Sequence, residues 1–184
     1  MILKPTPFED CFLIEHDAIP DNRGLFVKLY HEDTFSKFGL SFKLKEEYYS
    51  ISNARVIRGM HFQIPPYEHI KIVSCLEGEV LDVLLDLRKN KETYGQSFSC
   101  TLKPEKPESL YIPPGIAHGF LSIKENSLTH YILTSAYEVK SDKGILWNSF
   151  DFIWPEKNPI LSERHIPLNL LPVCKLTILF QSVI

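Results

Sequence analysis

The sequence predicts an all-β fold, an antiparallel double-sheet barrel of the jelly-roll kind with short helices at its periphery. Short segments rich in β-branched and aromatic residues follow one another along the whole chain. Thirteen prolines and eight glycines separate these segments, which is typical of strands joined by turns. No repeat, low-complexity tract or linker interrupts the pattern, so we expect one domain spanning residues 1–184.

Eleven segments have the composition of strands. In chain order they are 11–15, 24–30, 46–53, 55–62, 69–77, 79–86, 95–102, 109–112, 119–122, 127–134 and 145–147. The tetrapeptide Leu76-Glu77-Gly78-Glu79 separates two of them and predicts the turn of a β-hairpin. Only residues 31–38 and 161–171 are compatible with helices, and both segments are short.

Segment 80–87 is nearly continuous in apolar residues, which indicates a strand covered on both faces. Asp82 and Asp86 are four residues apart in this segment and therefore point to the same side of the strand. They either line a polar interior or pair with Arg88 and its neighbours. The β-prone apolar tail 176–180 is expected to pack on the barrel or on a second subunit.

Composition and charge argue against several function classes. The formal net charge is −3, which gives no electrostatic case for binding nucleic acid or a membrane surface. The N-terminus lacks the apolar run of a signal peptide, and no segment resembles a membrane span. Cys11, Cys75, Cys100 and Cys174 lie far apart, so we expect reduced, mostly buried thiols in a cytoplasmic protein, with neither disulfides nor a zinc site.

Cationic and titratable groups gather on segments that otherwise have the pattern of buried strands. These groups are Arg58 and His61 in one segment, Lys71 in the next, and His118 after a Pro-Pro-Gly turn. Unpaired buried charge costs several kcal/mol, so these groups are expected to share a polar cavity for an anionic ligand.

Strand alternation indicates which side chains enter that cavity. In their strands, Tyr131 points away from His130, and His61 points away from Arg58. We therefore expect His61, Lys71 and Tyr131 inside the barrel. Arg58 would reach a ligand only at the rim or across a subunit boundary.

These three residues suit one type of chemistry. A neutral histidine such as His61 is the usual general base near pH 7, and a supported tyrosine such as Tyr131 is a competent acid. Lys71 would stabilise an oxyanion between them. Together they suit proton abstraction next to a carbonyl group, which is the reaction logic of a cofactor-independent epimerase.

Other interpretations remain open. A histidine on a strand is often structural, and a catalytically silent sugar-binding barrel would use the same residues. A metal-binding cupin is a third possibility, with the pattern His61-x-Gln63, then Glu68 and His69, then Pro113-x-Gly115-x-x-His118. Glutamine is a poor metal ligand, and Lys71 would bring positive charge close to the cation, so metal binding is disfavoured.

Several motifs, taken in order, resemble those of the dTDP-4-dehydrorhamnose 3,5-epimerase family. They are Asp21-Asn22-Arg23-Gly24, Arg58-Gly59-Met60-His61-Phe62-Gln63, Lys71-Ile72-Val73, Gly78-Glu79-Val80-Leu81-Asp82-Val83, Asp86-Leu87-Arg88, Ile112-Pro113-Pro114-Gly115-Ile116-Ala117-His118-Gly119-Phe120 and Ile145-Leu146-Trp147-Asn148. The resemblance implies a cupin-type double-stranded β-helix (jelly roll), a homodimer, and neither metal nor organic cofactor. It also implies epimerisation at C3, C5 or both of a nucleotide-linked 4-keto-6-deoxy sugar, in deoxysugar synthesis for a surface polysaccharide or a glycosylated product.

The same resemblance assigns roles to individual residues. The family's catalytic base corresponds to His61, its catalytic acid to Tyr131, and the cation that stabilises the enolate to Lys71. Positions implied to contact the substrate are Arg23, Phe26, Glu46, Tyr48, Arg58, His118, Asp142 and Arg164. Arginine suits a diphosphate because its rigid fork makes bidentate charge-assisted hydrogen bonds.

The chain departs from the family at the partner of the base. The family has an aspartate after Leu-Ser-x-x that orients the catalytic histidine, and this chain has His165 at that place. Asp82 is one candidate replacement and His165 another. Without a replacement, we expect a slow enzyme or one that is selective for one carbon.

A second departure concerns the nucleotide base. The family's Gln-Asp-Asn, which precedes the strand that carries the catalytic base, is Glu46-Glu47-Tyr48 here, and the family's glutamate after Arg-Gly-x-Phe is Lys28. The aromatic residue that stacks on thymine in the family falls near Ala136, with Tyr137 next to it and on the opposite face. These changes suggest the hypothesis that a different base is accepted, for example cytosine on a CDP-linked sugar.

Overall fold

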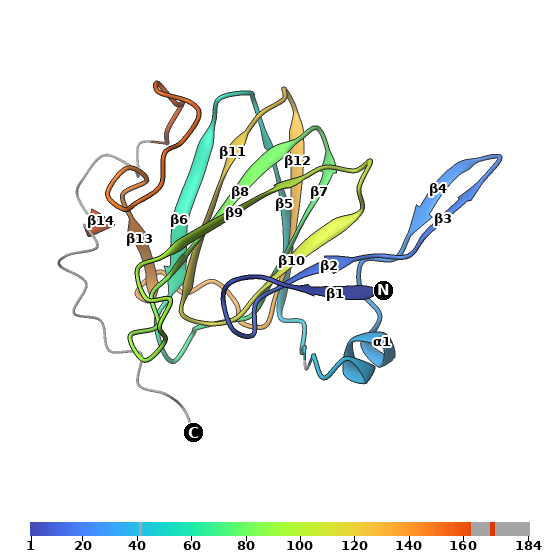
Figure 1. The fold of residues 1–184 in the computed structure, drawn as a ribbon, viewed down its shortest axis with the longest axis horizontal. Coiled ribbons are helices and arrows are strands. Elements are labelled where there is room, and N and C mark those ends of the chain that lie inside the picture. The colour runs from blue at the N-terminus through green and yellow to red at the C-terminus, as the bar shows by residue number, and fades with distance from the viewer. Residues whose placement is uncertain (41, 163–169, 172–184) are drawn as a thin grey trace.

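The computed structural model describes residues 1–40, 42–162 and 170–171. Nearly all of its elements are strands (Figure 1). The strands are β1 (Ile2–Pro5), β2 (Phe12–Glu15), β3 (Ala18–Asp21), β4 (Gly24–Val27), β5 (Glu46–Ser52), β6 (Ile57–Gln63), β7 (Lys71–Glu77), β8 (Val80–Asp86), β9 (Ser97–Leu102), β10 (Glu108–Ile112), β11 (Ile116–Ser122), β12 (Ser127–Leu133), β13 (Asp142–Ile145) and β14 (Leu170–Leu171). A short helix, α1 (Glu32–Lys37), follows β4. Within these residues, no helix has the length and apolar character needed to cross a membrane.

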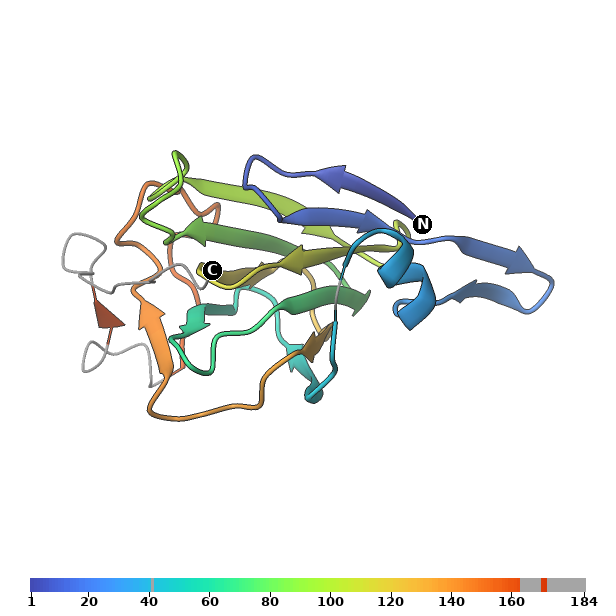
Figure 2. The same cartoon turned by 90° about the horizontal axis from the view of Figure 1, so that it is seen from below.

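The described strands form two six-stranded sheets and one separate hairpin. The first sheet has the order β1-β2-β10-β7-β12-β5, the second has the order β14-β13-β6-β11-β8-β9, and β3 pairs with β4. This arrangement is the predicted cupin-type jelly roll, seen as two layers in Figure 2. The β3–β4 hairpin extends away from both sheets in two perpendicular views (Figures 1 and 2).

The main core lies between the two sheets. Val73 and Leu110 of the first sheet pack there with Val80, Leu84 and Phe120 of the second. Two further apolar clusters cover the outer faces. One joins α1 to the first sheet, and the other joins the aromatic segment that follows β13 to the second sheet. Tyr131 belongs to the main core, which connects that core to the polar cavity described below.

The hairpin predicted at residues 76–79 is wrong. The chain does turn at Gly78, but β7 pairs with β10 and β12, whereas β8 pairs with β11 and β9. The turn therefore passes from one sheet to the other. Gly78 has a φ of +78°, and a Cβ there would collide with Ser127, so glycine is required for the close approach of the two segments.

The predicted strands otherwise agree with the structure, apart from their ends. The strands β1 and β3 were not predicted, and the strand expected at 145–147 lies instead at Asp142–Ile145, where the chain pairs with β6. The helix expected within 31–38 is α1. The helix expected at 161–171 is not supported, because residues 161–162 are not helical and residues 170–171 form β14. Residues 163–169 of that segment lie outside the described residues, as does the apolar tail 176–180.

The two buried aspartates of β8 each follow one of the two alternatives. Asp82 faces the interior and contacts His118. Asp86 accepts hydrogen bonds from Arg88 Nη2 and Thr93 Oγ1, both at 2.6 Å. Arg88 Nη1 also donates to the carbonyl of Glu9, so the Asp86–Arg88 pair fastens the β8–β9 connection to the N-terminal segment.

Candidate active site

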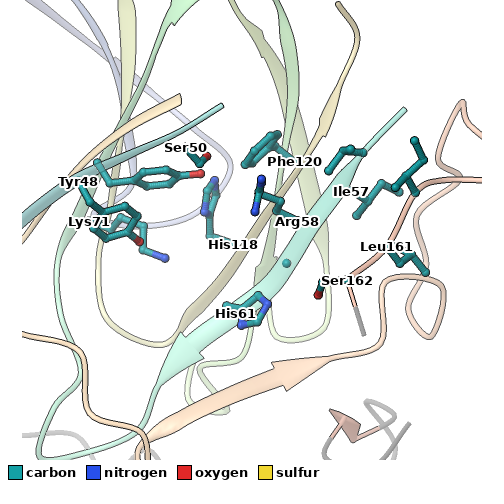
Figure 3. Close-up of a pocket in the computed structure, with 14 residues that line it drawn as sticks. Tyr48, Ser50, Ile57, Arg58, His61, Lys71, His118, Phe120, Leu161 and Ser162 are labelled. Carbon is teal, nitrogen blue, oxygen red and sulfur yellow. The ribbon is translucent and has the colours of Figure 1, made fainter. Parts of the chain in front are cut away.

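A polar cavity of about 580 Å³ opens between the two sheets (Figure 3). The side chains of its polar wall come from five strands. They are Tyr48 and Ser50 of β5, Arg58 and His61 of β6, Lys71 of β7, His118 of β11 and Tyr131 of β12. The four residues expected to share an interior, namely His61, Lys71, His118 and Tyr131, therefore do so.

Both Arg58 and His61 line this cavity, although strict alternation along β6 would place them on opposite faces. The register between β6 and β11 explains the difference. His118 pairs with His61 and Phe120 pairs with Arg58, so three steps along β6 match two along β11. This irregularity turns both side chains inward, while Met60 between them is fully buried in the outer core.

Close contact between backbones accompanies that irregularity. Gly59 has a φ of +111°, and a Cβ there would collide with the Cα of Gly119 on β11. Gly59 and Gly119 thus let β6 and β11 approach closely between the His61–His118 pair and the Arg58–Phe120 pair. Arg58 is exposed at the rim of the cavity, where its Nε donates to Ser52 Oγ at 2.9 Å.

His61 lies within reach of a carboxylate, but not the one expected. Its Nδ1 is 3.8 Å from Oδ1 of Asp142 on β13, and its side chain is 35% exposed to the cavity. The hypothesis that Asp82 partners His61 is wrong, because Asp82 contacts His118 instead. His165 and Arg164 lie outside the described residues.

His118 and Asp82 form a buried pair across β11 and β8. The Nε2 atom of His118 is 2.9 Å from Asp82 Oδ1 and 3.0 Å from Oδ2, and neither side chain is exposed by more than a few per cent. Burial lowers the pKa of His118, and the neighbouring Asp82 carboxylate partly opposes this effect. A neutral His118 that donates from Nε2 to Asp82 presents Nδ1 as its remaining polar atom.

We predict that Asp82→Ala destabilises the fold and lowers activity, whereas Asp82→Asn has a smaller effect on both. Removing the acceptor leaves a buried imidazole N–H unsatisfied, which should cost about 1 to 3 kcal/mol of unfolding free energy. Asparagine keeps an acceptor oxygen of similar size in the same place. Chemical denaturation and turnover measurements check the prediction, and equal stability of wild type and Asp82→Ala would contradict it.

Lys71 supplies a buried cation to the cavity. Its side chain is only 8% exposed, and burial lowers its pKa from 10.5 to about 8, with Asp82 and Asp142 partly offsetting the shift. Lysine is charged below its pKa, so at neutral pH Lys71 remains an ammonium that can balance a developing oxyanion.

This pKa predicts an alkaline limb in the rate profile. As pH rises through about 8, Lys71 loses its proton and kcat/KM should fall. In Lys71→Arg the group stays charged, so the variant should be slower overall but lack this limb up to about pH 10. An unchanged limb in Lys71→Arg would show that another group titrates.

Tyr131 is a buried phenol with two ring neighbours. Burial raises its pKa well above 10, so it remains protonated at neutral pH and can act as a proton donor. Its ring stacks on Tyr48 with a centroid distance of 4.7 Å and an interplanar angle of 25°. The edge contact to His118 has a centroid distance of 6.1 Å.

A second lobe of about 340 Å³ adjoins the first and shares Tyr48, His61 and Lys71 with it. Glu46 and Asp142, two positions that the resemblance assigned to substrate contact, line this lobe. Gln63 and His69, which the sequence named only in the disfavoured metal pattern, also line this lobe, as do Leu133 and Tyr137, to which it assigned no role. Alternation along β6 places Gln63 on the same face as His61, in agreement with this position.

Other lining residues were also missed. Ser50 lies two residues after Tyr48 on β5, so strand alternation could have identified it. Ser162 lines the first lobe through the segment after Ile160, whose pairing with Val56 is long-range and leaves no local signal.

Two predicted substrate contacts lie apart from both lobes. Arg23 and Phe26 belong to the projecting β3–β4 hairpin. The Arg23 side chain is 85% exposed and pairs with Asp21 at 2.6 Å, and Phe26 is 58% exposed. Within a single chain, the structure thus does not bring them to the cavity.

The alternative metal pattern can be compared with the same geometry. His69 lines the second lobe, where burial lowers its pKa to about 3, and its Nδ1 contacts the side-chain amide of Gln63 at 3.2 Å. Among the described residues, no three His, Cys, Asp or Glu side chains gather as metal ligands.

The chain and its fold are similar to those of known enzymes. The family model described as dTDP-4-dehydrorhamnose 3,5-epimerase matches residues 5–171. The enzyme of that name from Shigella flexneri is 34% identical over 164 residues, covering 88% of this chain and 91% of that protein. A dTDP-4-dehydrorhamnose 3-epimerase from Streptomyces niveus is 32% identical, covering 89% of this chain and 81% of its own length.

Structural similarity extends over nearly the whole chain. The crystal structure of the 3,5-epimerase from Bacillus anthracis, with TDP and PPi bound, superposes with a TM-score of 0.89 at 32% identity. That comparison covers 92% of this chain and 99% of the other.

Proposed function

Because the chain belongs to the dTDP-4-dehydrorhamnose 3,5-epimerase family, we propose that it epimerises a 4-keto-6-deoxy sugar carried on dTDP, in deoxysugar synthesis. The observation that carries the proposal is the meeting of His61, Lys71 and Tyr131 in one cavity between the sheets. Each has the ionisation behaviour or exposure that its role needs, as the following steps describe.

Catalysis begins with proton removal next to the ketone. His61 takes the proton from the carbon, and the electron pair of the broken C–H bond forms the C=C bond of an enolate. The enolate oxygen carries the negative charge, and the ammonium of Lys71 stabilises it. His61 suits this role because it is partly open to the cavity and has Asp142 near Nδ1, so Nε2 can face the substrate.

The second step returns a proton from the other side. Tyr131 donates its hydroxyl proton to the carbon, which restores the ketone and inverts the centre. His61 lies on the second sheet and Tyr131 on the first, so acid and base come from opposite walls. The phenolate and imidazolium left behind then exchange protons with solvent.

The substrate's diphosphate is assigned to Arg58 and to His118, with the sugar near Glu46, Tyr48 and Asp142 in the second lobe. Arg58 supports this assignment because its guanidinium lies at the rim of the cavity, where Ser52 Oγ and the carbonyl of Ile51 accept hydrogen bonds from it. The cytosine hypothesis gains no support from the relatives described above, since their names specify dTDP-linked sugars. Calorimetry with dTDP and CDP decides between the bases, and tighter binding of CDP would contradict the proposal.

Arg23 and Phe26 lead us to propose a homodimer. They lie on a hairpin that exposes Ile19, Leu25 and Phe26 by more than half and extends away from both sheets (Figure 2). Such an apolar surface on a projecting element suits an interface. In a symmetric dimer the hairpin of one protomer would cover the cavity of the other and bring Arg23 to its diphosphate.

Mixing two inactive variants tests the dimer. His61→Ala lacks the base, and Arg23→Ala lacks the hairpin cation. A mixed dimer would contain one complete site, so a denatured and refolded equal mixture should recover about one quarter of wild-type activity. Recovery of no activity by the mixture, or a monomer in light scattering, would contradict the proposed arrangement.

We also propose a cytoplasmic location, which the free thiols of Cys11, Cys75 and Cys100 support.

The epimerase proposal itself is tested by product analysis. The purified protein is incubated with dTDP-4-keto-6-deoxyglucose, the products are reduced with borohydride, and the released 6-deoxyhexoses are identified by chromatography. Sugars inverted at C3, C5 or both are expected. If folded protein gives only 6-deoxyhexoses that keep the original configuration at C3 and C5, the proposal is contradicted.

A further inference from the structure

Tyr48 and Tyr131 are directly opposite each other on neighbouring strands. The register of β5 and β12 pairs these two residues, and their rings stack at 4.7 Å with an angle of 25°. Tyr131 is only 5% exposed, whereas Tyr48 is 41% exposed and lines both lobes of the cavity. The ring of Tyr48 therefore covers one face of the buried Tyr131, which itself also lines the first lobe.

Tyr131 also has a neighbour on another side. The imidazole of His118 meets it edge-on, with a centroid distance of 6.1 Å and an angle of 69°. His118 is in turn held by Asp82, so this contact is rigid. Between a fixed edge and a stacked face, the Tyr131 ring has little freedom to rotate.

The stack on Tyr131 occupies only one face of the Tyr48 ring, and the rest of this side chain remains available to line the cavity.

We propose that Tyr48 is a positioning residue that holds Tyr131 in the orientation from which it protonates the enolate. The inference rests on the epimerase function proposed above. It concerns how often an enolate ends in inversion, because an enolate can also regain a proton from the side of His61. A poorly held Tyr131 would favour that return, so protons would exchange with solvent without inversion.

The ratio of inversion to solvent exchange tests the proposal. Wild type, Tyr48→Ala, Tyr48→Phe and Tyr49→Ala are compared in D₂O, with deuterium uptake and inversion followed by proton NMR. Tyr48→Ala should lower the inversion-to-exchange ratio about tenfold, and Tyr48→Phe, which keeps the stack, should stay within about twofold of wild type. Tyr49 is the matched control, since it neighbours Tyr48 on β5, is 64% exposed and lines neither lobe.

Several outcomes would overturn the inference while leaving the epimerase function intact. An unchanged ratio in Tyr48→Ala, with only KM raised, would make Tyr48 a substrate contact. Equal loss of exchange and inversion, or a matching change in Tyr49→Ala, would make its role structural. By contrast, absence of exchange in wild type would contradict the proposed function.

A second readout needs no substrate. In protein labelled at the tyrosine Cζ carbon, the Tyr131 resonance, identified with Tyr131→Phe, is followed as pH rises. Loss of the Tyr48 ring lets solvent reach Tyr131, so its pKa should fall in Tyr48→Ala and be largely restored in Tyr48→Phe. An unchanged Tyr131 titration in Tyr48→Ala would contradict the positioning role.

Discussion

Replacing His61 with alanine should abolish both deuterium uptake and inversion at every carbon of the substrate. The variant lacks the base that removes the carbon-bound proton, so no enolate forms. General bases of this kind contribute rate factors of about 10² to 10⁴, and we expect a loss of about 10³ in kcat. The fold should survive, because the His61 side chain is 35% exposed and lies at the cavity wall rather than in the core.

His130→Ala is the matched control for this prediction. His130 lies on β12 beside Tyr131 but pairs with Glu47 at 2.9 Å on the outer face of the sheet. Its replacement should leave the rate within about twofold of wild type, since it touches neither lobe. Retained deuterium uptake in His61→Ala would require a different base and would contradict the account.

Replacing Tyr131 with phenylalanine should separate the two proton transfers. The variant keeps His61 and Lys71, so deuterium uptake should stay within about threefold of wild type. Inversion should fall by about 10², because the phenol that protonates the opposite face is gone. The ring and its stack on Tyr48 remain, so the unfolding free energy should change little.

The comparison that checks this prediction is the ratio of uptake to inversion in one reaction. Tyr49→Phe serves as the control, since it also removes a phenolic hydroxyl, but from an exposed tyrosine on the adjacent strand β5. If uptake and inversion fall together in Tyr131→Phe, Tyr131 acts before the enolate forms, and the assigned acid role is wrong.

Local patterns predicted much of this site from the sequence. Alternation placed Tyr131 inside and His130 outside, and both positions are confirmed. A buried strand at 80–87 with two aspartates on one side is likewise confirmed as β8. These features depend only on the two-residue period of a strand, which the residues themselves display.

The errors arise where long-range pairing decides the geometry. Arg58 faces the cavity because β6 and β11 slip in register around Gly59 and Gly119, and alternation along one strand cannot report a slip between two. The turn at Gly78 has the sequence of a hairpin but connects two sheets, which depends on the partners that β7 and β8 choose.

Long-range strand pairing also decides which carboxylate lies near His61. Asp82 was a reasonable candidate because of its inward position, but it contacts His118 on the adjacent strand β11 instead. Asp142, which lies nearer to His61, comes from β13, a strand whose place beside β6 is set by a pairing of residues about eighty positions apart.

The measurement that tests the central claim most directly is proton NMR of the wild-type protein in D₂O with freshly generated 4-keto-6-deoxy sugars on dTDP and on CDP. The account predicts deuterium uptake at C3, C5 or both of the dTDP-linked sugar, accompanied by inversion. Folded protein that exchanges no carbon-bound proton on either substrate would contradict it.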